Sequence, residues 1–439
     1  MLIIQRGCTR ASEGPIAMFE NQEIIFFGVL LIIPIFGLLN TSSGEPVAID
    51  PRLTIEKVYT GNFEPSTMAF LGLEDILVLD RDNGKVLRVQ NGIEEKTILD
   101  VNVATDGYRG LLGIAVSAEH KRPSNVFLYY TESRNKDGED DSDNSVPPLG
   151  NRIYKYDLVD NRLLNPTLLL DLPALPGPRH AGGVLAIGPD DNLYATVGDL
   201  DGTFKNQFET MAQNYKTGKP ADGRSGILVL SKNGEPLSQG ILGNSVPLKY
   251  YYAYGIRNSF GIDWDPLTSN LWDSENGPTF GDELNLVFPG FNSGWASIQG
   301  YWKPNLENKG PEISEPTNLV DFNGNGKYSS PEFVWLLPAA PSAIKFLDND
   351  LYGTQYENDL LVGDANNGYI YDFNLDEDRM KFDLSGSIED NIADNAEELD
   401  QLIFAKGFGK VADIKIGPDG FIYVLSTESD TANIYRIQP

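Results

Sequence analysis

The sequence predicts an all-β fold, a six-bladed β-propeller with long acidic surface loops. Short β-type runs broken by Gly, Pro, Asn and Asp follow one another from residue 45 onward, and hardly any segment has sustained helical periodicity. A hairpin pattern also recurs, made of an apolar residue, a GPDG-type turn and a hydrophobic strand. Because one hairpin cannot bury both of its faces, such copies favour radial stacking, and a β-sandwich rarely repeats one signature over so long a chain.

The hairpin pattern occurs in six copies, three of them degenerate. In chain order the copies cover residues 70–89, 116–132, 187–199, 262–275, 346–373 and 416–426. Polar and acidic segments lie between them, and they are predicted to be long loops on the propeller faces. These segments are 133–150, 201–225 and 376–400.

The N-terminal part, residues 1–44, is predicted to be an export signal or a short membrane anchor. Residues 24–39 are an apolar run without charge, and turn-forming residues follow it. The run is longer than a typical signal-peptide core and shorter than the ~20 residues that cross a bilayer comfortably, so both interpretations stay open. We expect residues 45–439 to be a single propeller domain outside the cytoplasm, secreted or anchored to the outer face of the cell membrane. The single cysteine, Cys8, precedes the run, so disulfides cannot stabilise this domain.

The charge balance limits the possible partners. The chain has 34 Lys and Arg against 63 Asp and Glu, a formal net charge of −29. Such a charge repels phosphate backbones, so nucleic-acid binding is not expected. The excess of carboxylates suits divalent cations, although most of these acids are expected to form a solvated surface.

His180 is one of two histidines in the chain and the first candidate for chemistry. It follows a proline-rich connection and precedes two glycines, which allow a ligand or a backbone segment to approach the imidazole closely. Asp199 ends the next strand, and one hairpin can bring its carboxylate beside the ring, where it fixes the tautomer of a general base. A structural histidine, hydrogen-bonded within a loop, is the alternative interpretation.

Several motifs in this order carry a family resemblance. They are GLLGIAV at 110–116, RHAGGVLAIGPDDNLYATVGD at 179–199, YGIRNSFGIDWDP at 254–266, ENGPTFGDELN at 275–285 with NSGW at 292–295, and KVADIKIGPDGFIYVLS at 410–426. Together they resemble the soluble glucose and sorbosone dehydrogenase family of quinoproteins. The resemblance implies a propeller with pyrroloquinoline quinone (PQQ) on its axis, which oxidises an aldose at the anomeric carbon.

The resemblance also implies roles for individual residues. His180 is similar to the catalytic base, Asp199 to the acid that orients it, and Arg257 and Asn258 to residues that touch the quinone. The carbonyls of Gly277 and Pro278 are similar to ligands of a calcium ion that polarises the cofactor. Three acids are similar to residues near further calcium sites, namely Glu275, Asp282 and Glu283.

The sequence departs from the family where the carboxylates of PQQ need cations. The family supplies a lysine and two arginines, whereas the residues at these positions of the chain are Asn366 or Asn367, Lys410 and Ala412. A lysine in place of an arginine loses bidentate geometry. A cationic pocket rebuilt from other residues is the expectation, and its members are Arg109, Arg179, Arg257 and Lys410.

A second metal signal is DFNGNGKYSSPE, Asp321 to Glu332, which fits the EF-hand loop pattern in full. Because no flanking helix is predicted and Pro331 breaks helical continuity, we expect structural calcium, with a solvated Asn-Gly turn as the alternative. The predicted ligands are Asp321, Asn323, Asn325, the Lys327 carbonyl, Ser329 and Glu332.

The sequence therefore predicts an exported oxidoreductase that uses PQQ and calcium on an aldose or related sugar alcohol, with a small-molecule sugar as its partner. The substituted cationic positions favour one alternative, a non-catalytic calcium-binding propeller at the cell surface that binds a protein or glycan. A calcium-dependent sugar lactone hydrolase ranks third. That class needs carboxylate and Asn ligands converging from several blades, whereas the axial sequence of this chain offers a His and an Arg-Asn pair.

Overall fold

The computed structural model describes residues 44–119, 122–135, 140–142, 145–202, 207–304 and 312–439. The predicted N-terminal segment with Cys8 and the apolar run 24–39 lies outside the described residues. Helical turns within them are confined to four 3₁₀-helices, η1 (Met211–Gln213), η2 (Leu248–Tyr250), η3 (Gly386–Ile388) and η4 (Ala396–Leu402). None of these has the length and apolar character required to cross a bilayer.

The strands of the described residues form seven sheets, six of which have at least four strands. Four of the six lie toward the N-terminal side of the chain. In hydrogen-bonded order their strands are β3 (Pro65–Gly72), β4 (Asp75–Asp80), β5 (Lys85–Gln90) and β6 (Ile93–Asp100); β7 (Leu111–Glu119), β8 (Arg122–Glu132), β9 (Gly150–Val159) and β10 (Arg162–Leu172); β11 (Leu185–Ile187), β12 (Leu193–Val197), β13 (Gly226–Leu230), β14 (Tyr251–Tyr254), β18 (Phe291–Asn292) and β21 (Lys327–Tyr328); and β15 (Ser259–Trp264), β16 (Leu271–Glu275), β17 (Asp282–Val287), β22 (Phe333–Trp335) and β26 (Ile392–Ala393).

The other three sheets come from the C-terminal half and the two chain ends. They are β23 (Pro341–Phe346), β24 (Leu360–Asp364), β25 (Tyr369–Phe373), β27 (Ile403–Lys406) and β1 (Val47–Ala48); β28 (Lys410–Ile416), β29 (Ile422–Glu428), β30 (Thr431–Gln438) and β2 (Thr54–Gly61); and the two-stranded β19 (Trp302–Lys303) with β20 (Glu312–Ile313).

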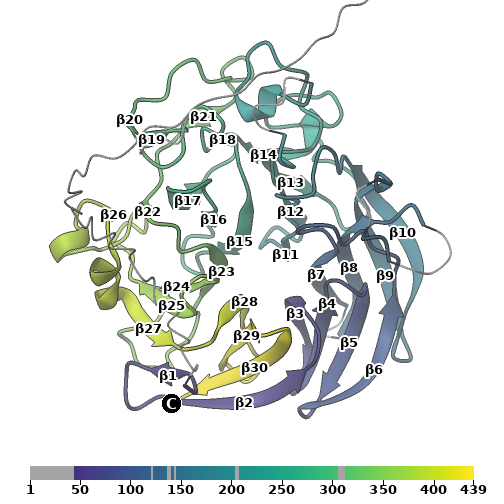
Figure 1. Ribbon diagram of the computed structural model, residues 1–439, viewed down its shortest axis with the longest axis vertical. Coiled ribbons are helices and arrows are strands. Elements are labelled where there is room, and N and C mark those ends of the chain that lie inside the picture. The colour runs from purple at the N-terminus through teal and green to yellow at the C-terminus, as the bar shows by residue number, and fades with distance from the viewer. Residues whose placement is uncertain (1–43, 120–121, 136–139, 143–144, 203–206, 305–311) are drawn as a thin grey trace, which may run out of the picture. The chain divides into compact units, whose positions relative to one another are not determined.

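The sheets stand side by side around a common centre, with β3, β7, β11, β15, β23 and β28 nearest to it (Figure 1). The all-β propeller prediction is confirmed. Each of the six predicted hairpin copies falls in a different sheet and contains the turn from this innermost strand to the next. The ring is closed by β2, which pairs antiparallel with β30 from the other end of the chain.

The core lies between neighbouring sheets. Since each sheet is covered on both faces, middle strands such as β13 and β24 are buried along their whole length. Large aromatic rings fill the gap between the β15–β26 sheet and the β23–β27 sheet. The centre of the Phe333 ring lies 4.8 Å from that of Trp335 and 4.9 Å from that of Phe373. This packing fixes the inner strand ends that surround the axis.

Two of the predicted long loops carry structure of their own. The 201–225 segment contains η1, whose Ala212 and Gln213 are buried. The 376–400 segment contains η3, β26 and most of η4, and Ile388 and Leu399 anchor it in the core. Both segments therefore contain short apolar anchors, which their polar composition hides from sequence reasoning.

Two acids in the β23–β27 sheet make stability depend on pH. Burial raises the pKa of Asp359 to about 7, and burial together with the charge of Asp359 raises the pKa of Asp372. Because both folded pKa values lie above the unfolded value, the protonated groups favour the fold below about pH 4. The contribution of Asp359 is lost as the pH rises through about 7, and that of Asp372 is lost as the pH rises through its own raised pKa.

Replacing Asp372 with Asn should therefore stabilise the protein at pH 8 by roughly 1 to 3 kcal/mol and leave it nearly unchanged at pH 4. Urea unfolding at the two pH values measures this difference. Asp400, which is exposed, provides the control through Asp400→Asn. Equal stability of Asp372→Asn and the wild type at pH 8 would contradict the assignment.

Candidate active site

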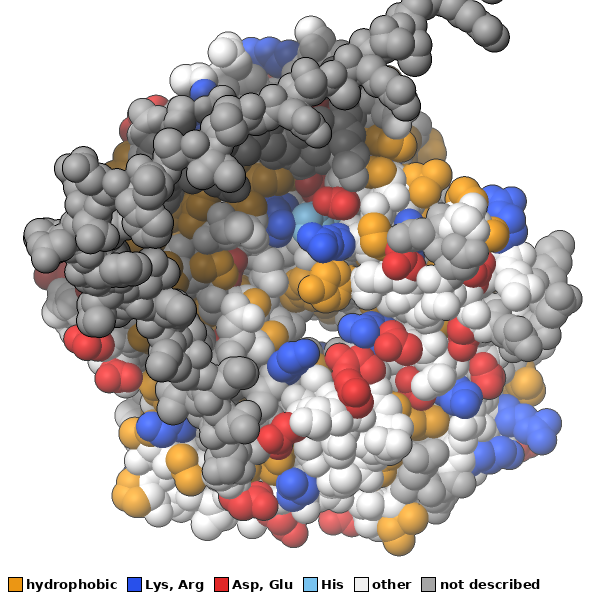
Figure 2. Space-filling model, viewed as in Figure 1, with side chains coloured by type: hydrophobic (Ala, Val, Ile, Leu, Met, Phe, Trp, Pro, Cys, Tyr) orange, Lys and Arg blue, Asp and Glu red, His pale blue; other side chains and the backbone are white. Residues whose placement is uncertain are grey.

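The inner ends of the sheets surround a cavity of about 500 Å³, which we call the axial hollow. Figure 2 shows an opening at the centre of the ring, with cationic and histidine side chains gathered beside it. Five of the predicted site residues line it, namely His180, Arg257, Asn258, Gly277 and Lys410. Apolar side chains such as Phe260 form part of the wall.

His180 and Asp199 meet as predicted. Imidazole Nδ1 lies 2.6 Å from Asp199 Oδ1, and the carboxylate is buried with 1% of its surface exposed. Both residues stand on tight turns: the backbone of His180 is left-handed, with φ of 57°, and the amide of Asp199 donates to the Arg257 carbonyl at 2.8 Å. Gly182 is required two residues later, because a Cβ there would lie 2.4 Å from the Thr196 carbonyl oxygen.

Arg257 completes the constellation. One of its nitrogens, Nη2, lies 2.9 Å from His180 Nε2, and Nη1 donates to the Asn276 carbonyl at 2.6 Å. A guanidinium has donors and no acceptor, so Nε2 accepts this bond and the imidazole proton sits on Nδ1, facing Asp199. Burial lowers the pKa of Arg257, and the charge of Asp199 opposes that effect. The basic nitrogen of His180 thus points into the hollow but is covered by a cation.

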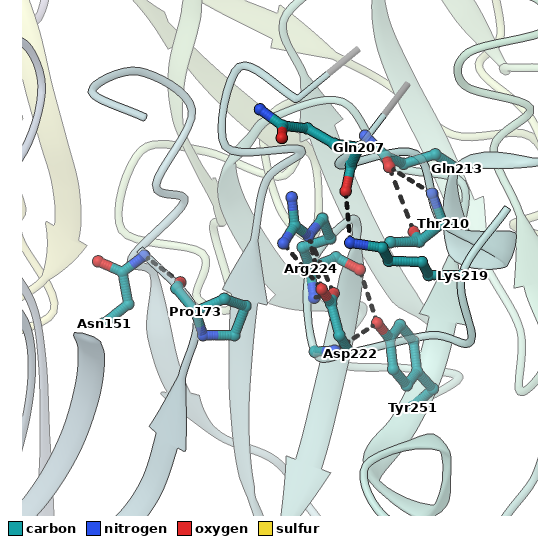
Figure 3. Close-up of polar contacts among 10 residues, drawn as sticks. Asn151, Pro173, Gln207, Thr210, Gln213, Lys219, Asp222, Arg224 and Tyr251 are labelled. Atoms are coloured by element: carbon teal, nitrogen blue, oxygen red, sulfur yellow. Dashed lines mark hydrogen bonds and ion pairs between the residues drawn. The ribbon is translucent and has the colours of Figure 1, made fainter. Parts of the chain in front are cut away.

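The turn behind Asp199 is supported by a buried polar network, shown in Figure 3. Arg224 donates to Asp222 through Nε at 2.9 Å and Nη2 at 2.8 Å, while Tyr251 donates to the Arg224 carbonyl at 2.6 Å. Gly202 fits against this network, since a Cβ there would lie 3.1 Å from Arg224 Nη1 and 2.9 Å from the Asp199 carbonyl oxygen. Ser225, which follows Arg224, donates its amide to the Gly198 carbonyl at 2.9 Å and so connects the network to the residue before Asp199.

The loop with Gly277 and Pro278 forms one rim of the hollow. Asp282 holds it, because Oδ1 accepts from the Gly277 amide at 2.7 Å and Oδ2 accepts from the Ala340 amide at 2.7 Å. Burial raises the pKa of Asp282 to about 6. Both of its oxygens accept from backbone amides, so Asp282 clamps the loop.

Glu275 and Glu283 are cross-strand partners on one face of β16 and β17, and both are buried. Glu275 accepts from the Arg257 amide and from Ser293 Oγ, each at 2.7 Å, and Glu283 accepts from Gln299 Nε2 at 2.8 Å. Burial raises the pKa of Glu283 to about 7, and burial and the charge of Glu283 raise that of Glu275. Within the described residues, neither carboxylate forms an ion pair with a lysine, arginine or histidine.

The predicted acids do not form a ready metal centre. In the described parts of the chain, no three Asp, Glu, His or Cys side chains are grouped so that they could hold a metal ion. Asp282 faces backbone amides, whereas Glu275 and Glu283 lie below the loop between the two strands. Sequence adjacency in GDE hides this difference, because neighbouring strand residues point to opposite faces.

Two of the predicted cations are not at the hollow. Arg109 is buried, and its Nη2 donates to the Ala174 carbonyl at 2.8 Å, so the side chain braces the proline-rich connection. The side chain of Arg179 is exposed and outside the lining. Sequence reasoning missed two cations that do line the hollow, Arg81 and Lys415. The signal available for them was the position of Arg81 in the first hairpin copy and of Lys415 in the motif at 410–426.

The first half of the predicted calcium loop forms a tight turn. Asp321 Oδ1 accepts from the Asn323 amide at 3.1 Å, and its carbonyl accepts from the amides of Gly324 and Gly326 at 3.0 Å and 2.8 Å. The glycine with left-handed backbone in this turn is Gly324, with φ of 84°, and not the predicted Gly326. This half agrees with either interpretation, a calcium loop or an Asn-Gly turn.

The second half departs from an EF-hand loop. Lys327 and Tyr328 become β21, and the Glu332 amide donates to the Leu284 carbonyl at 2.8 Å in the neighbouring sheet. Burial raises the pKa of Glu332 to about 7, and the charge of Lys381 opposes this rise. Residues 321–332 are all described and contain no helix to return the last ligand to the first, so the six predicted ligands do not enclose one centre in the manner of an EF-hand.

Comparison with known proteins decides the family. The sequence matches Glucose / Sorbosone dehydrogenase over residues 63–436. The chain belongs to this family. The predicted resemblance is confirmed, and so is the prediction of an enzyme: members of the glucose/sorbosone dehydrogenase family are oxidoreductases that act on sugars.

Relatives of this dehydrogenase family member cover between about half and nearly all of the chain. Aldose sugar dehydrogenase YliI of Escherichia coli is 24% identical over 412 residues, which are 93% of this chain and 98% of the relative. Quinoprotein glucose dehydrogenase B of Acinetobacter calcoaceticus is 30% identical over 264 residues, 56% of this chain and 53% of the relative. The PQQ-bound structure of an aldose sugar dehydrogenase from Streptomyces coelicolor has a TM-score of 0.61 at 22% identity, covers 90% of this chain and 99% of its own, and shares the fold.

Replacing Asp282 with Ala should release the rim of the hollow, because two backbone amides lose their acceptor. We expect faster hydrogen exchange at Gly277 and Ala340 and a loss of roughly 1 to 3 kcal/mol in the free energy of unfolding. Exchange read by NMR, with exposed Asp400→Ala as control, measures this effect. Unchanged exchange at both amides would mean that Asp282 does not hold the loop.

Proposed function

We propose that this protein is an exported sugar dehydrogenase with six blades, one for each sheet of four or more strands, and that it oxidises an aldose at its anomeric carbon with PQQ and calcium. The observation that carries the proposal is the constellation of His180, Asp199 and Arg257 beside one hollow in a member of a sugar dehydrogenase family. Export is supported by the sequence of residues 24–39.

The protein residues divide the work. His180 Nε2 accepts the proton of the sugar's C1 hydroxyl, which takes the place of the Arg257 guanidinium at that nitrogen. Asp199 stabilises the imidazolium that results, because Nδ1 already donates to its carboxylate. Arg257, once displaced, donates to negative charge that develops nearby. PQQ, when bound, supplies the two-electron acceptor for the hydride of C1, and the sugar leaves as the lactone.

The hollow fits a ligand of the size and charge of PQQ. Its volume of about 500 Å³ is within the range of small-molecule sites. Arg81, Arg257, Lys410 and Lys415 line it, although Asp82 and Asp413 pair with two of these cations at 2.8 Å and 2.7 Å. The buried Asn276 Oδ1 has no hydrogen-bond partner among the described residues, so it can accept a hydrogen bond from a ligand in the hollow. We assign Arg257, Asn258, Lys410 and Lys415 to the cofactor.

Calcium fits in two places. The Gly277–Pro278 rim, which Asp282 clamps, offers backbone carbonyls, and calcium there would act as a Lewis acid. Glu275 and Glu283 offer a second position, since both carboxylates are buried and neither is paired with a cation of the described residues. A divalent ion bound there would lower their raised pKa values. For the Asp321 loop we propose no EF-hand site; any calcium there would be held by the turn of residues 321–326 alone.

One observation favours a second candidate, a propeller that binds a sugar without oxidising it. Asn366 lines the hollow at a position where the family resemblance implies a lysine, so one carboxylate of the quinone lacks its expected partner. In this case the hollow would accept a glycan end, and His180 would serve as a hydrogen-bonding residue.

Purified protein supplied with PQQ and calcium should reduce a dye acceptor when an aldose is added. His180→Gln should lower the turnover by on the order of 10²- to 10⁴-fold while PQQ still binds, because only the base is lost. Dye reduction and a PQQ titration are the two measurements. Absence of both turnover and quinone binding in the wild type would reject the proposal, and sugar binding without quinone binding would support the second candidate.

Lys410→Ala and Lys415→Ala should each raise the dissociation constant for PQQ, by the equivalent of about 1 to 3 kcal/mol for one charge-assisted bond. Titration followed by quinone absorbance measures the constant. Lys406→Ala removes an exposed lysine outside the hollow and is the matched control. If both hollow variants bind PQQ like the control, the quinone does not occupy this wall.

A further inference from the structure

We propose that Trp295 is a positioning residue of the active site. It contacts both Asp199 and Arg257 and thereby sets the tautomer and the orientation of the His180 imidazole. The sequence motif that contains it, NSGW, has no chemical role in the assignments above. This inference rests on the proposed function, since it concerns how the base is kept ready for the sugar hydroxyl.

The first contact of Trp295 is with the acid. Its indole Nε1 donates to Asp199 Oδ2 at 2.9 Å, while Oδ1 accepts from His180 Nδ1 at 2.6 Å and from the Asp201 amide at 2.9 Å. Donors therefore reach both oxygens of a buried carboxylate, which is the environment of an ionised acceptor. The indole bond opposes rotation of the carboxylate away from the imidazole.

The second contact is with the cation. The Arg257 guanidinium carbon lies 5.5 Å from the centre of the Trp295 ring, within the range of a cation–π interaction. The same guanidinium donates to the Asn276 carbonyl and to His180 Nε2. One aromatic side chain thus contacts the partner of each imidazole nitrogen, Asp199 for Nδ1 and Arg257 for Nε2.

Trp295 is itself held rigidly. It is 3% exposed, its amide donates to the Gly255 carbonyl at 2.9 Å, and its carbonyl accepts from Asn214 Nδ2 at 2.8 Å. Asn214 also exchanges two hydrogen bonds of 2.9 Å with Asn292. The backbone of Trp295 is therefore fixed at both its amide and its carbonyl, and burial confines the indole beside Asp199 and Arg257.

A packing role alone predicts a different result from a positioning role. If Trp295 only fills space, Trp295→Phe lowers stability and leaves the imidazole unchanged. If it positions the carboxylate, loss of the indole N–H leaves Asp199 Oδ2 without this donor, and the Nδ1–H bond of His180 loosens. The imidazole of His180 is therefore the group to observe.

The chain offers a clean spectroscopic signal because it has only two histidines, His120 and His180. In a His120→Gln background, one imidazole remains, and the NMR resonance of its Nδ1 proton reports the bond to Asp199. We expect Trp295→Phe to shift this resonance upfield and to speed its exchange with water. Trp335→Phe, which removes another fully buried indole, should leave the resonance in place.

A second measurement covers the case in which Trp295→Phe does not fold. Asp199→Asn changes the acceptor of the indole, so one of the five tryptophan N–H resonances should move, and Trp295 labelling should assign it. An unmoved His180 proton in folded Trp295→Phe, or unmoved indole resonances in Asp199→Asn, would overturn the proposal.

Kinetics separate this inference from the proposed function. With PQQ and calcium bound, Trp295→Phe should lower kcat by about 10- to 100-fold with KM for the sugar nearly unchanged, because orientation of the base and not sugar binding is lost. If the wild type binds no quinone while the NMR shifts appear as expected, the proposed function fails and the positioning role of Trp295 stands.

Discussion

Pairing of β2 with β30 closes the ring of sheets, and the axial hollow depends on that closure. Residues 54–61 and 431–438 come from opposite ends of the described chain, yet they share one sheet with β28, which carries Lys410 and Lys415 into the wall. Without this pairing, the outer edge of β30 would be free, and the last sheet would lose its connection to the start of the described chain. Closure of a long chain costs entropy that increases only slowly with length, so continuous pairing along a whole strand can outweigh it.

The electrostatics of the site run against the composition of the chain. A protein of net charge −29 collects arginine and lysine side chains around its axis and buries Glu275 and Glu283 just below the rim. The cations make the hollow a place for an anionic ligand, while the buried acids make the region beneath it a place for a cation. The fold therefore places a cationic wall and a pair of buried acids with raised pKa values in the same region of the propeller.

The fold and the centre of the site could be predicted from the sequence because both are written in local patterns. Each hairpin copy is a continuous stretch, and His180 and Asp199 are joined by one hairpin, so their meeting needed no long-range information. Whether a given side chain faces the hollow or points away from it could not be predicted from local patterns. Arg109 stands beside a family motif but donates to the Ala174 carbonyl, whereas Arg81 reaches the hollow from a position without a distinctive motif. Lys415 lies within the motif at 410–426, but the motif does not say which of its side chains face the hollow. The Asp321 loop fits its motif at every position and still lacks the returning helix, because β21 and the Leu284 contact pull its second half into two sheets.

The guanidinium that covers Nε2 has a consequence for trace metals. A neutral imidazole with a free lone pair is the side chain that zinc and copper ions take up most readily. In this protein the lone pair of His180 is already bonded to Arg257, and its other nitrogen carries a proton directed at Asp199. A trace metal ion must therefore displace the Arg257 guanidinium before it can coordinate Nε2. This requirement disfavours inhibition of the free protein by such ions.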